Sequence, residues 1–258
     1  MKFAIISDIH GNLEALNAVL AKAEQEGVQK YICAGDVVGY NANPHECLEQ
    51  IRSLNLVAMV RGNHDEYVGS DTELVGFNPY AKRAVMWAKK QLNDEEREWL
   101  AAQKLKKVLL KDKITIVHAT LDSPSMWGYI FDVHHAKDNF SYQMTQLCFC
   151  GHSHVPIMFR KGISIVNSKG NVEEVKPWAD ISQSEITIPI KTDCKYLVNI
   201  GSVGQPRNSD PRASFVIYDS DKKQLTRCAV EYDIATAQGK VLRAGLPDNL
   251  AKRLALGY

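Results

Sequence analysis

The sequence lacks a long hydrophobic run and lacks an excess of charge of either sign. No apolar stretch in its 258 residues reaches the ~18 residues that a membrane-spanning helix needs. Its 31 basic and 30 acidic residues leave a net charge of +1, which predicts no binding to duplex nucleic acid or to an anionic membrane. The segment MKFAIISDIHG has an apolar run too short for a signal-peptide core. We therefore expect a cytoplasmic protein.

Cysteines are few, and no linker divides the chain. The six cysteines, at positions 33, 47, 148, 150, 194 and 228, lie mostly inside apolar runs, which predicts reduced, buried thiols. Cys148 and Cys150 precede His152 and His154, but this C-x-C-x-H-x-H spacing matches no zinc finger. No run rich in glycine, proline or serine and no internal repeat is found. We expect residues 1–258 to form a single domain.

The first half of the chain alternates short apolar runs with amphipathic stretches. Runs at 3–6, 31–34 and 56–60 have the near-continuous hydrophobicity of strands that are buried on both faces. Helices are predicted after Asn12, Asn43, Asn78 and Asn93, each of which can cap a helix. This order of elements indicates an α/β protein with parallel strands.

After Val108 the helical pattern fades and strands are predicted instead. They are expected at 108–117, 145–150, 155–166, 172–175, 185–190, 196–200, 213–219 and 225–232, which predicts a second, largely antiparallel sheet. Residues 122–143 are interpreted as a cap-like excursion near the site, and their aromatic residues either stack on a base or simply pack. Residues 252–258 are expected to be a helical or frayed tail.

Histidines are scarce, yet five of the eight follow predicted strands. Those strand ends carry Asp8, His10, Asp36, Asn63, His64, His118, His152 and His154. Ligands of open α/β sheets collect outside the carboxyl ends of the strands. Taken singly, Asp8 would serve as a helix cap, Asn63 as a turn residue and His118 as a core histidine. Two carboxylates packed among imidazoles in a dry crevice need positive charge, which divalent metal ions supply.

The types of ligand predict the kind of metal centre. Imidazole, carboxylate and amide donors without thiolate suit first-row divalent ions, and we expect manganese first, with iron, nickel or zinc as alternatives. Seven ligands exceed the needs of one ion with an open position, so two ions sharing a carboxylate are expected. Strand alternation would place both side chains of D-x-H and of H-x-H on one face. Gly35, Gly62 and Gly151 would allow sharp turns beside the metals.

These motifs resemble the signature of the calcineurin-like metallophosphoesterases. The resemblance rests on Asp8-x-His10, Gly35-Asp36, Gly62-Asn63-His64-Asp65, His118 and Gly151-His152-Ser153-His154, in this order. The later run at 199–207 is similar to the small bacterial branch of that superfamily. The resemblance implies a two-sheet β-sandwich core flanked by helices. It also implies one metal held by Asp8, His10 and His154, another held by Asn63, His118 and His152, and Asp36 as the bridge.

The same resemblance implies an activity. It predicts a phosphoesterase that hydrolyses a small phosphodiester or a dinucleoside polyphosphate by attack of a metal-bridging hydroxide, with His64 as the catalytic group at the leaving oxygen. The alternative role for His64 is to orient Asn63 or a water. Other functions that stay open are a phosphomonoesterase or protein phosphatase of the same superfamily and a non-catalytic interaction module. The partner is therefore a small phosphorylated substrate, a nucleotide among the candidates, and the oligomeric state is open.

Residues outside the metal motifs are candidates for the substrate. Arg207 follows a glycine-rich strand end, and its guanidinium is expected to bind phosphate, unless it is a plain surface arginine. Tyr40 and Asn41 follow the Asp36 loop and are expected to line the entrance, unless they only form a turn. Asp65 either orients His64 or caps the turn.

Overall fold

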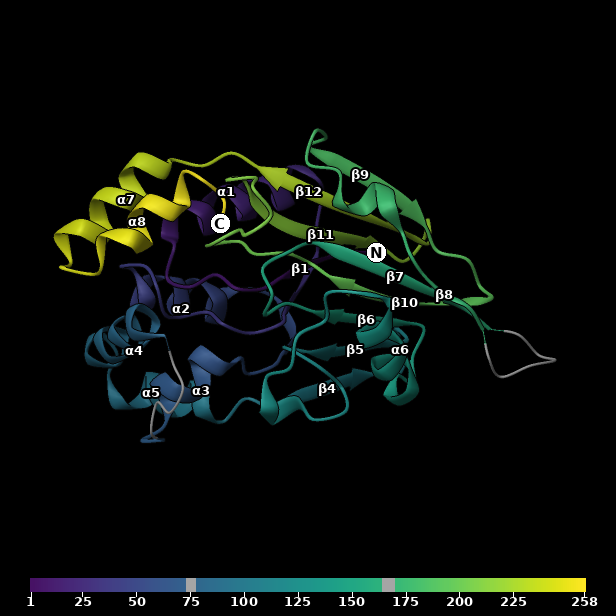
Figure 1. The fold of residues 1–258 in the computed structure, drawn as a ribbon, viewed down its shortest axis with the longest axis horizontal. Helices are drawn as coiled ribbons and strands as arrows, with labels where there is room; N and C mark the ends of the chain where they lie inside the picture. Colours follow the sequence, from purple (N-terminus) through teal and green to yellow (C-terminus); the bar gives the residue numbers. More distant parts are fainter. Residues whose placement is uncertain (73–77, 164–169) are drawn as a thin grey trace.

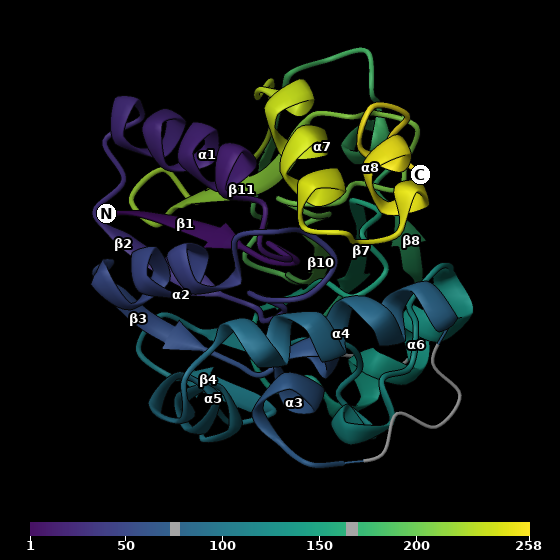
Figure 2. The same cartoon turned by 90° about the vertical axis from the view of Figure 1, so that its left-hand side faces the viewer.

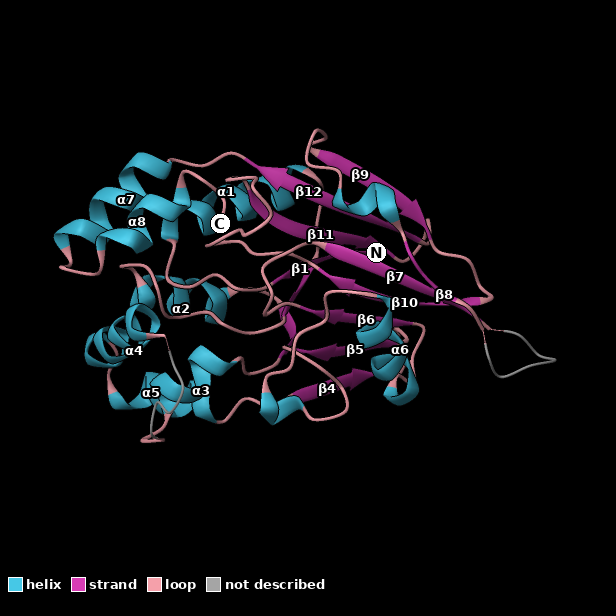
Figure 3. Cartoon of the chain, viewed as in Figure 1, coloured by secondary structure: helices cyan, strands magenta, loops and turns pink. Residues whose placement is uncertain are grey.

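Two six-stranded sheets pack face to face, and helices cover the outer face of each (Figures 1 and 3). The computed structural model describes residues 1–72, 78–163 and 170–258. The predicted α/β fold with a two-sheet core flanked by helices is confirmed. Within the described residues, no helix is long and apolar enough to span a bilayer.

The first sheet has the order β3-β2-β1-β11-β12-β9. Its strands are β1 (Lys2–Ile6), β2 (Lys30–Cys33), β3 (Leu56–Met59), β9 (Glu185–Pro189), β11 (Ala213–Asp219) and β12 (Gln224–Val230). The first three strands run parallel, whereas β11 pairs antiparallel with β1 and is followed by an antiparallel ladder through β12 to β9.

The second sheet has the order β4-β5-β6-β10-β7-β8. Its strands are β4 (Lys106–Leu109), β5 (Ile114–Val117), β6 (Leu147–Cys150), β7 (Ile157–Gly162), β8 (Val172–Glu174) and β10 (Cys194–Asn199). The three inner strands β5, β6 and β10 run parallel, and the flanking pairs are antiparallel.

The expected second sheet is present, but it does not contain all the strands that were predicted for it and it is not largely antiparallel. Three strands of the second half, β9, β11 and β12, extend the first sheet, and both sheets are mixed. An apolar run shows that a strand is buried but does not show which strand it pairs with. For this reason the sequence did not reveal which sheet these three strands join. The predicted strand at 155–166 corresponds to β7, and its last residues, 164–166, lie outside the described part.

Successive side chains of a strand point alternately to the other sheet and to the covering helices. Phe3 and Ile5 of β1 face the second sheet and pack in one cluster with Phe149 of β6, whereas Ala4 and Ile6 point outward to the helices. This period of two puts one apolar face of each sheet in the shared core and the other under helices. All six cysteines are free and buried, as predicted.

Helices cover the outer faces of the sheets. The helices of the described residues are α1 (Leu13–Gln25), α2 (Pro44–Ser53), α3 (Asn63–Gly69), α4 (Pro79–Gln91), α5 (Asp94–Ala101), α6 (Val133–Tyr142), α7 (Ile234–Arg243) and α8 (Asp248–Leu254), with short 3₁₀ turns at Pro124–Met126 and Lys176–Ala179. Of these, α8 packs in one cluster with α7 and α4. Asn12, Asn78 and Asn93 cap their helices with side-chain oxygens, as predicted, but Asn43 makes no capping bond. The sequence reading missed α7.

The segment 122–143 divides into two parts. Residues Val133–Tyr142 form α6, and Ala136 and Phe140 of this helix pack in one cluster with Phe159 and Leu197 on the outer face of the second sheet. The part before α6 approaches the predicted metal ligands, because the main-chain carbonyl of Trp127 lies 2.9 Å from His152 Nε2.

Candidate metal centre

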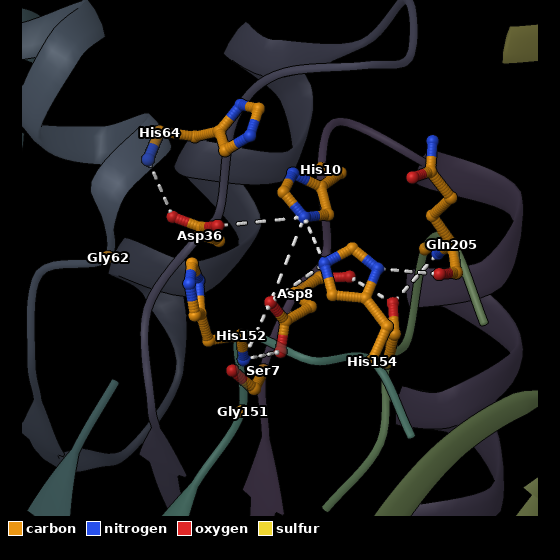
Figure 4. Close-up of polar contacts among 12 residues, drawn as sticks. Ser7, Asp8, His10, Asp36, Gly62, His64, Gly151, His152, His154 and Gln205 are labelled. Atoms are coloured by element: carbon orange, nitrogen blue, oxygen red, sulfur yellow. Dashed lines mark hydrogen bonds and ion pairs between the residues drawn. The ribbon is translucent and has the colours of Figure 1, made fainter. Parts of the chain in front are cut away.

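The predicted ligands meet where the parallel strands of both sheets end. A motif with predicted ligands follows each of the strands β1, β2, β3, β5 and β6. Figure 4 shows side chains from these loops pointing toward one another. The seven predicted ligands and His64 are buried, and none is more than 8% exposed: Asp8, His10, Asp36, Asn63, His64, His118, His152 and His154. The structure brings together every member of the predicted set.

One group of ligand atoms comes from Asp8, His10 and His154. His154 Nε2 lies 3.2 Å from Asp8 Oδ1, and His10 Nε2 lies 3.8 Å from the same oxygen. The two Nε2 atoms are only 3.1 Å apart. One carboxylate oxygen and two imidazole nitrogens therefore converge on one point (Figure 4), which is the arrangement that a divalent cation needs.

A second group comes from Asp36, His118 and His152. His118 Nε2 lies 3.3 Å from Asp36 Oδ2, yet neither this nitrogen nor Asn63 Oδ1 has a hydrogen-bond partner among the described residues. Buried polar atoms without partners are costly, and a cation would satisfy both of these. The donor set and these two orphaned atoms fit a metal.

Asp36 stands between the two groups. Its Oδ2 is 3.7 Å from His10 Nε2 in the first group and 3.3 Å from His118 Nε2 in the second. Its Oδ1 accepts a hydrogen bond from the main-chain N–H of His64 at 2.9 Å, which fixes the carboxylate plane. One carboxylate is thus within reach of both groups, as a bridging ligand must be.

Main-chain carbonyls orient the imidazoles. The Nδ1–H groups of His10, His118 and His154 donate to the carbonyl oxygens of Val38, Ala34 and Gln205 at 3.0, 2.8 and 2.7 Å. Each bond turns the Nε2 atom of that ring into the site. His152 is reversed, because its Nε2 bonds to the Trp127 carbonyl and leaves Nδ1 for the site. Such outer contacts select the tautomer that a metal ligand requires.

The backbone at the ligands is strained. Asp8, His10, Asp36, His152 and His154 all have φ between +51° and +68°, the left-handed region that residues with a Cβ rarely adopt. The expectation that strand alternation aligns D-x-H and H-x-H is therefore wrong, since these residues lie beyond the strands in left-handed turns. Strain of this kind persists only where the surroundings stabilise it, and it clusters at functional sites.

Two of the three site glycines provide room rather than a turn. Gly35 has φ +97°, so it does make the expected turn. A Cβ on Gly62 would lie 2.1 Å from Asp36 Oδ1, and one on Gly151 would lie 2.2 Å from Asp8 Oδ2. Gly62 and Gly151 therefore let the two carboxylates approach the backbone.

Asp65 holds the loop that carries Asp36. Its carboxylate accepts main-chain N–H bonds from Asp36, Val37 and Gly62 at 2.7, 2.9 and 3.2 Å. The bond from Gly62 is the turn cap that the sequence allowed, but the bonds to the Asp36 loop were not foreseen. Burial, and then the nearby Asp36 carboxylate, raise the pKa of Asp65 to about 7.

Burial sets the charge of most imidazoles. It lowers the pKa of His64 to about 4 and that of His152 to about 3, so both rings are neutral near pH 7. Burial also acts to lower the pKa of His118, but Asp36 and Asp8 outweigh it and raise this pKa to about 9. Burial acts to raise the pKa of Asp36, yet His118 and His64 hold it well below the usual value. Ionised carboxylates and mostly neutral imidazoles favour cation binding.

The predicted substrate residues separate into two groups. Tyr40 and Arg207 meet at the edge of the site, where Arg207 Nη2 donates to the Tyr40 hydroxyl at 3.3 Å. The Tyr40 ring lies 4.6 Å from that of His10 and 4.4 Å from that of His64. Asn41 instead is 2% exposed, and its amide donates to the His10 main-chain carbonyl at 3.1 Å. It braces the ligand loop and does not line the pocket beside Tyr40.

Sequence reasoning missed two contributors to the site. The Gln205 carbonyl orients His154, and the Tyr129 ring stacks on His152 with centroids 4.3 Å apart. Gln205 lies within the run at 199–207 that carries part of the family resemblance, but a main-chain contact leaves no mark on the residue type. Tyr129 lies in the excursion already placed near the site.

Comparisons with known proteins point to one family. A family model described as the calcineurin-like phosphoesterase superfamily domain matches residues 1–223. An uncharacterized protein from Methanocaldococcus jannaschii is 40% identical over 256 residues, which are 98% of this chain and 97% of that protein.

Solved structures agree with this match. A crystal structure of a metallophosphoesterase from Sphaerobacter thermophilus shares 36% sequence identity and a TM-score of 0.83, covering 100% of this chain and 99% of its own. A hypothetical protein from Pyrococcus horikoshii shares the fold, with 20% identity and a TM-score of 0.76 over 100% of this chain and 98% of its own.

Proposed function

The chain belongs to the calcineurin-like phosphoesterase superfamily, and from this premise we propose that it hydrolyses a small phosphodiester or a dinucleoside polyphosphate at a dinuclear metal centre. Membership makes the chain a phosphoric ester hydrolase. The family uses divalent metals and acts on small phosphorylated substrates. The proposal adds the number of metals, the class of ester and the roles of individual residues.

The position of Asp36 between two ligand groups carries the proposal. Asp8, His10 and His154 form one group, and His118 and His152 form the other. Asn63, with its orphaned Oδ1, completes the second group. We assign the first metal to Asp8, His10 and His154, the second to Asn63, His118 and His152, and the bridge to Asp36.

Residues of the chain that do not bind metal have separate roles in the proposed reaction. Bound divalent ions would supply a water acidified toward neutral pH and positive charge for the phosphate oxygens. His64 holds its ring beside those of His10 and Tyr40, within the site, and we assign it the hydrogen bond to the leaving oxygen. Arg207 presents its guanidinium at the pocket edge, where it binds a phosphate oxygen. The buried ligand loops exclude bulk water from the reacting centre.

Several finer points belong to the proposal as well. The nitrogen and oxygen donors suit manganese first, with iron, nickel and zinc as alternatives. A single domain, a cytoplasmic location and a nucleotide as part of the substrate stay predictions of the sequence. Phosphomonoester or phosphoprotein hydrolysis at the same centre is the second candidate. A non-catalytic role ranks last, because all seven ligand positions carry ligating side chains that converge.

The test is a phosphate-release assay with manganese. The substrates are phosphodiesters, dinucleoside polyphosphates, cyclic nucleotides and phosphomonoesters, and wild type is compared with His64→Ala. We expect kcat to fall about 10²–10⁴-fold in the variant, the usual contribution of a general acid or base, while metal content is retained. His134→Ala, which removes an exposed histidine of α6, is the matched control.

The outcomes separate the candidates. Equal turnover by His64→Ala and wild type would remove the catalytic role of His64. Turnover confined to phosphomonoesters would favour the second candidate. A metal-loaded wild type that releases nothing from the whole panel would support the non-catalytic alternative.

A further inference from the structure

A pocket of about 650 Å³ opens beside the metal centre. Tyr40 and Arg207 form its inner wall, and the Tyr40 ring also touches His10 and His64. Its outer wall comes from the start of α4 and from α8, which lies above α4 in Figure 2. The α8 wall lies beyond residues 1–223, the part that the family model matches.

Basic side chains outnumber acidic ones in the lining of the pocket. Arg207, Lys252 and Arg253 line it, and no acidic residue does so among the residues that the structure places. Within the same described ranges, Arg207 forms no ion pair with an Asp or Glu side chain, whereas Arg253 bonds the main-chain oxygen of Tyr258. Among the described residues, the Arg207 guanidinium donates to neutral groups of Tyr40 and Gln205, and its buried Nε has no partner. A guanidinium without a carboxylate partner, as in Arg207, is suited to bind phosphate.

Arg207 and Arg253 line the same pocket, so their like charges act on each other. Burial first, and then the charge of Arg207, lower the pKa of Arg253. The Arg253 Nε–H donates to the main-chain oxygen of Tyr258, the last residue of the sequence, and this bond fixes the side chain in the pocket wall. An anion between the two guanidiniums would remove this repulsion.

Aromatic rings line the rest of the pocket. Tyr40, Tyr80, Tyr129 and Tyr258 all contribute to it. Tyr129 stacks on His152, so one ring links the pocket directly to the second ligand group. Flat faces beside cationic groups suit a compound that has an aromatic ring attached to phosphates.

We propose that Arg207 and Arg253 bind a second phosphate of the substrate, beyond the phosphate that is cleaved, and that the tyrosines hold its aromatic ring. The inference rests on the proposed function and narrows the substrate to a nucleotide-like ester with at least two phosphates. In this chain α8 is thus a specificity element.

The kinetic test compares two substrates. Diadenosine tetraphosphate has additional phosphates and aromatic rings, whereas bis(p-nitrophenyl) phosphate has a single phosphate. Arg253→Gln should lower kcat/KM for the tetraphosphate at least tenfold more than for the diester, mainly by raising KM, since a charge-assisted hydrogen bond contributes about 1.5–3 kcal/mol. Arg253→Lys should recover part of the loss. Arg243→Gln, an exposed arginine of α7, is the matched control and should change neither substrate.

A binding test is independent of turnover. Adenosine 5′-tetraphosphate is titrated calorimetrically into metal-free wild type, Arg253→Gln and Lys252→Gln in the presence of chelator. We expect at least tenfold weaker binding by Arg253→Gln and a smaller loss for the exposed Lys252. Lys252→Gln keeps the test valid if Arg253→Gln is unstable.

The two tests fail in different ways. Equal effects of Arg253→Gln on both substrates, or unchanged binding by both α8 variants, would overturn the second-phosphate site and leave the hydrolase intact. Charge-dependent binding without any hydrolysis by the metal-loaded wild type would retain the site and overturn the proposed function. A wild type that binds no tetraphosphate, while it hydrolyses the diester, would also overturn the site.

Discussion

Replacing Asp65 by asparagine should destabilise the whole protein, although Asp65 holds no metal in our assignment. Its two carboxylate oxygens each accept from the main chain: Oδ2 from Asp36 and Gly62, and Oδ1 from Val37. An amide has one oxygen and one NH₂ group. Whichever way the amide is turned, at least one buried N–H of the ligand loop loses its acceptor and faces another donor.

The magnitude follows from the number of lost acceptors. A buried donor without a partner costs about 1–3 kcal/mol, so one or two such donors predict a loss of about 1–6 kcal/mol in the free energy of unfolding. Whole proteins are stable by only about 5–15 kcal/mol, so a loss at the upper end would be severe. Because the loop carries Asp36, the variant should also bind metal more weakly.

The assay is urea unfolding of metal-free protein, followed by calorimetric titration with manganese. Asp233→Asn is the matched control, because Asp233 caps α7 and asparagine caps a helix equally well. If Asp65→Asn lost no more stability than Asp233→Asn and bound manganese like the wild type, the proposed role of Asp65 in holding the Asp36 loop would be refuted.

Two further predictions concern the carboxylates. Asp36→Asn should abolish phosphate release while the chain stays folded, because one bridging charge is lost; retained turnover in the assay would contradict the bridge. Gly151→Ala should reduce metal content, measured by elemental analysis, because the new Cβ would lie 2.2 Å from Asp8 Oδ2. Gly162→Ala is its control, since a Cβ there meets nothing within 4 Å, and equal metal content in both variants would contradict the role of Gly151.

Local chemistry explains why the sequence could predict that the candidate ligands converge. Each motif follows an apolar run, and the ends of parallel strands meet at one edge whatever the order of the strands. The convergence of Asp8, Asp36 and His118 therefore did not depend on knowing the topology. The caps at Asn12 and Asn93 were predictable for the same reason, since a cap involves only a few neighbouring residues.

Features that depend on distant partners were not predictable in this way. The pairing of β11 with β1 joins residues more than 200 positions apart, and nothing in either apolar run specifies the other. The left-handed turns at the ligands were missed because their stability comes from other loops, such as the bond from Asp8 N–H to the Gly35 carbonyl at 2.9 Å.

The amino-acid sequence by itself determined the family, the α/β class and the set of candidate metal ligands, because order and spacing along the chain encode them. Only the tertiary structure decided that β9, β11 and β12 complete the first sheet, that Asp65 clamps the Asp36 loop, and that α8 forms a wall of the pocket. These depend on contacts between residues far apart in the chain. Such contacts arise from packing in three dimensions, which a one-dimensional pattern does not specify.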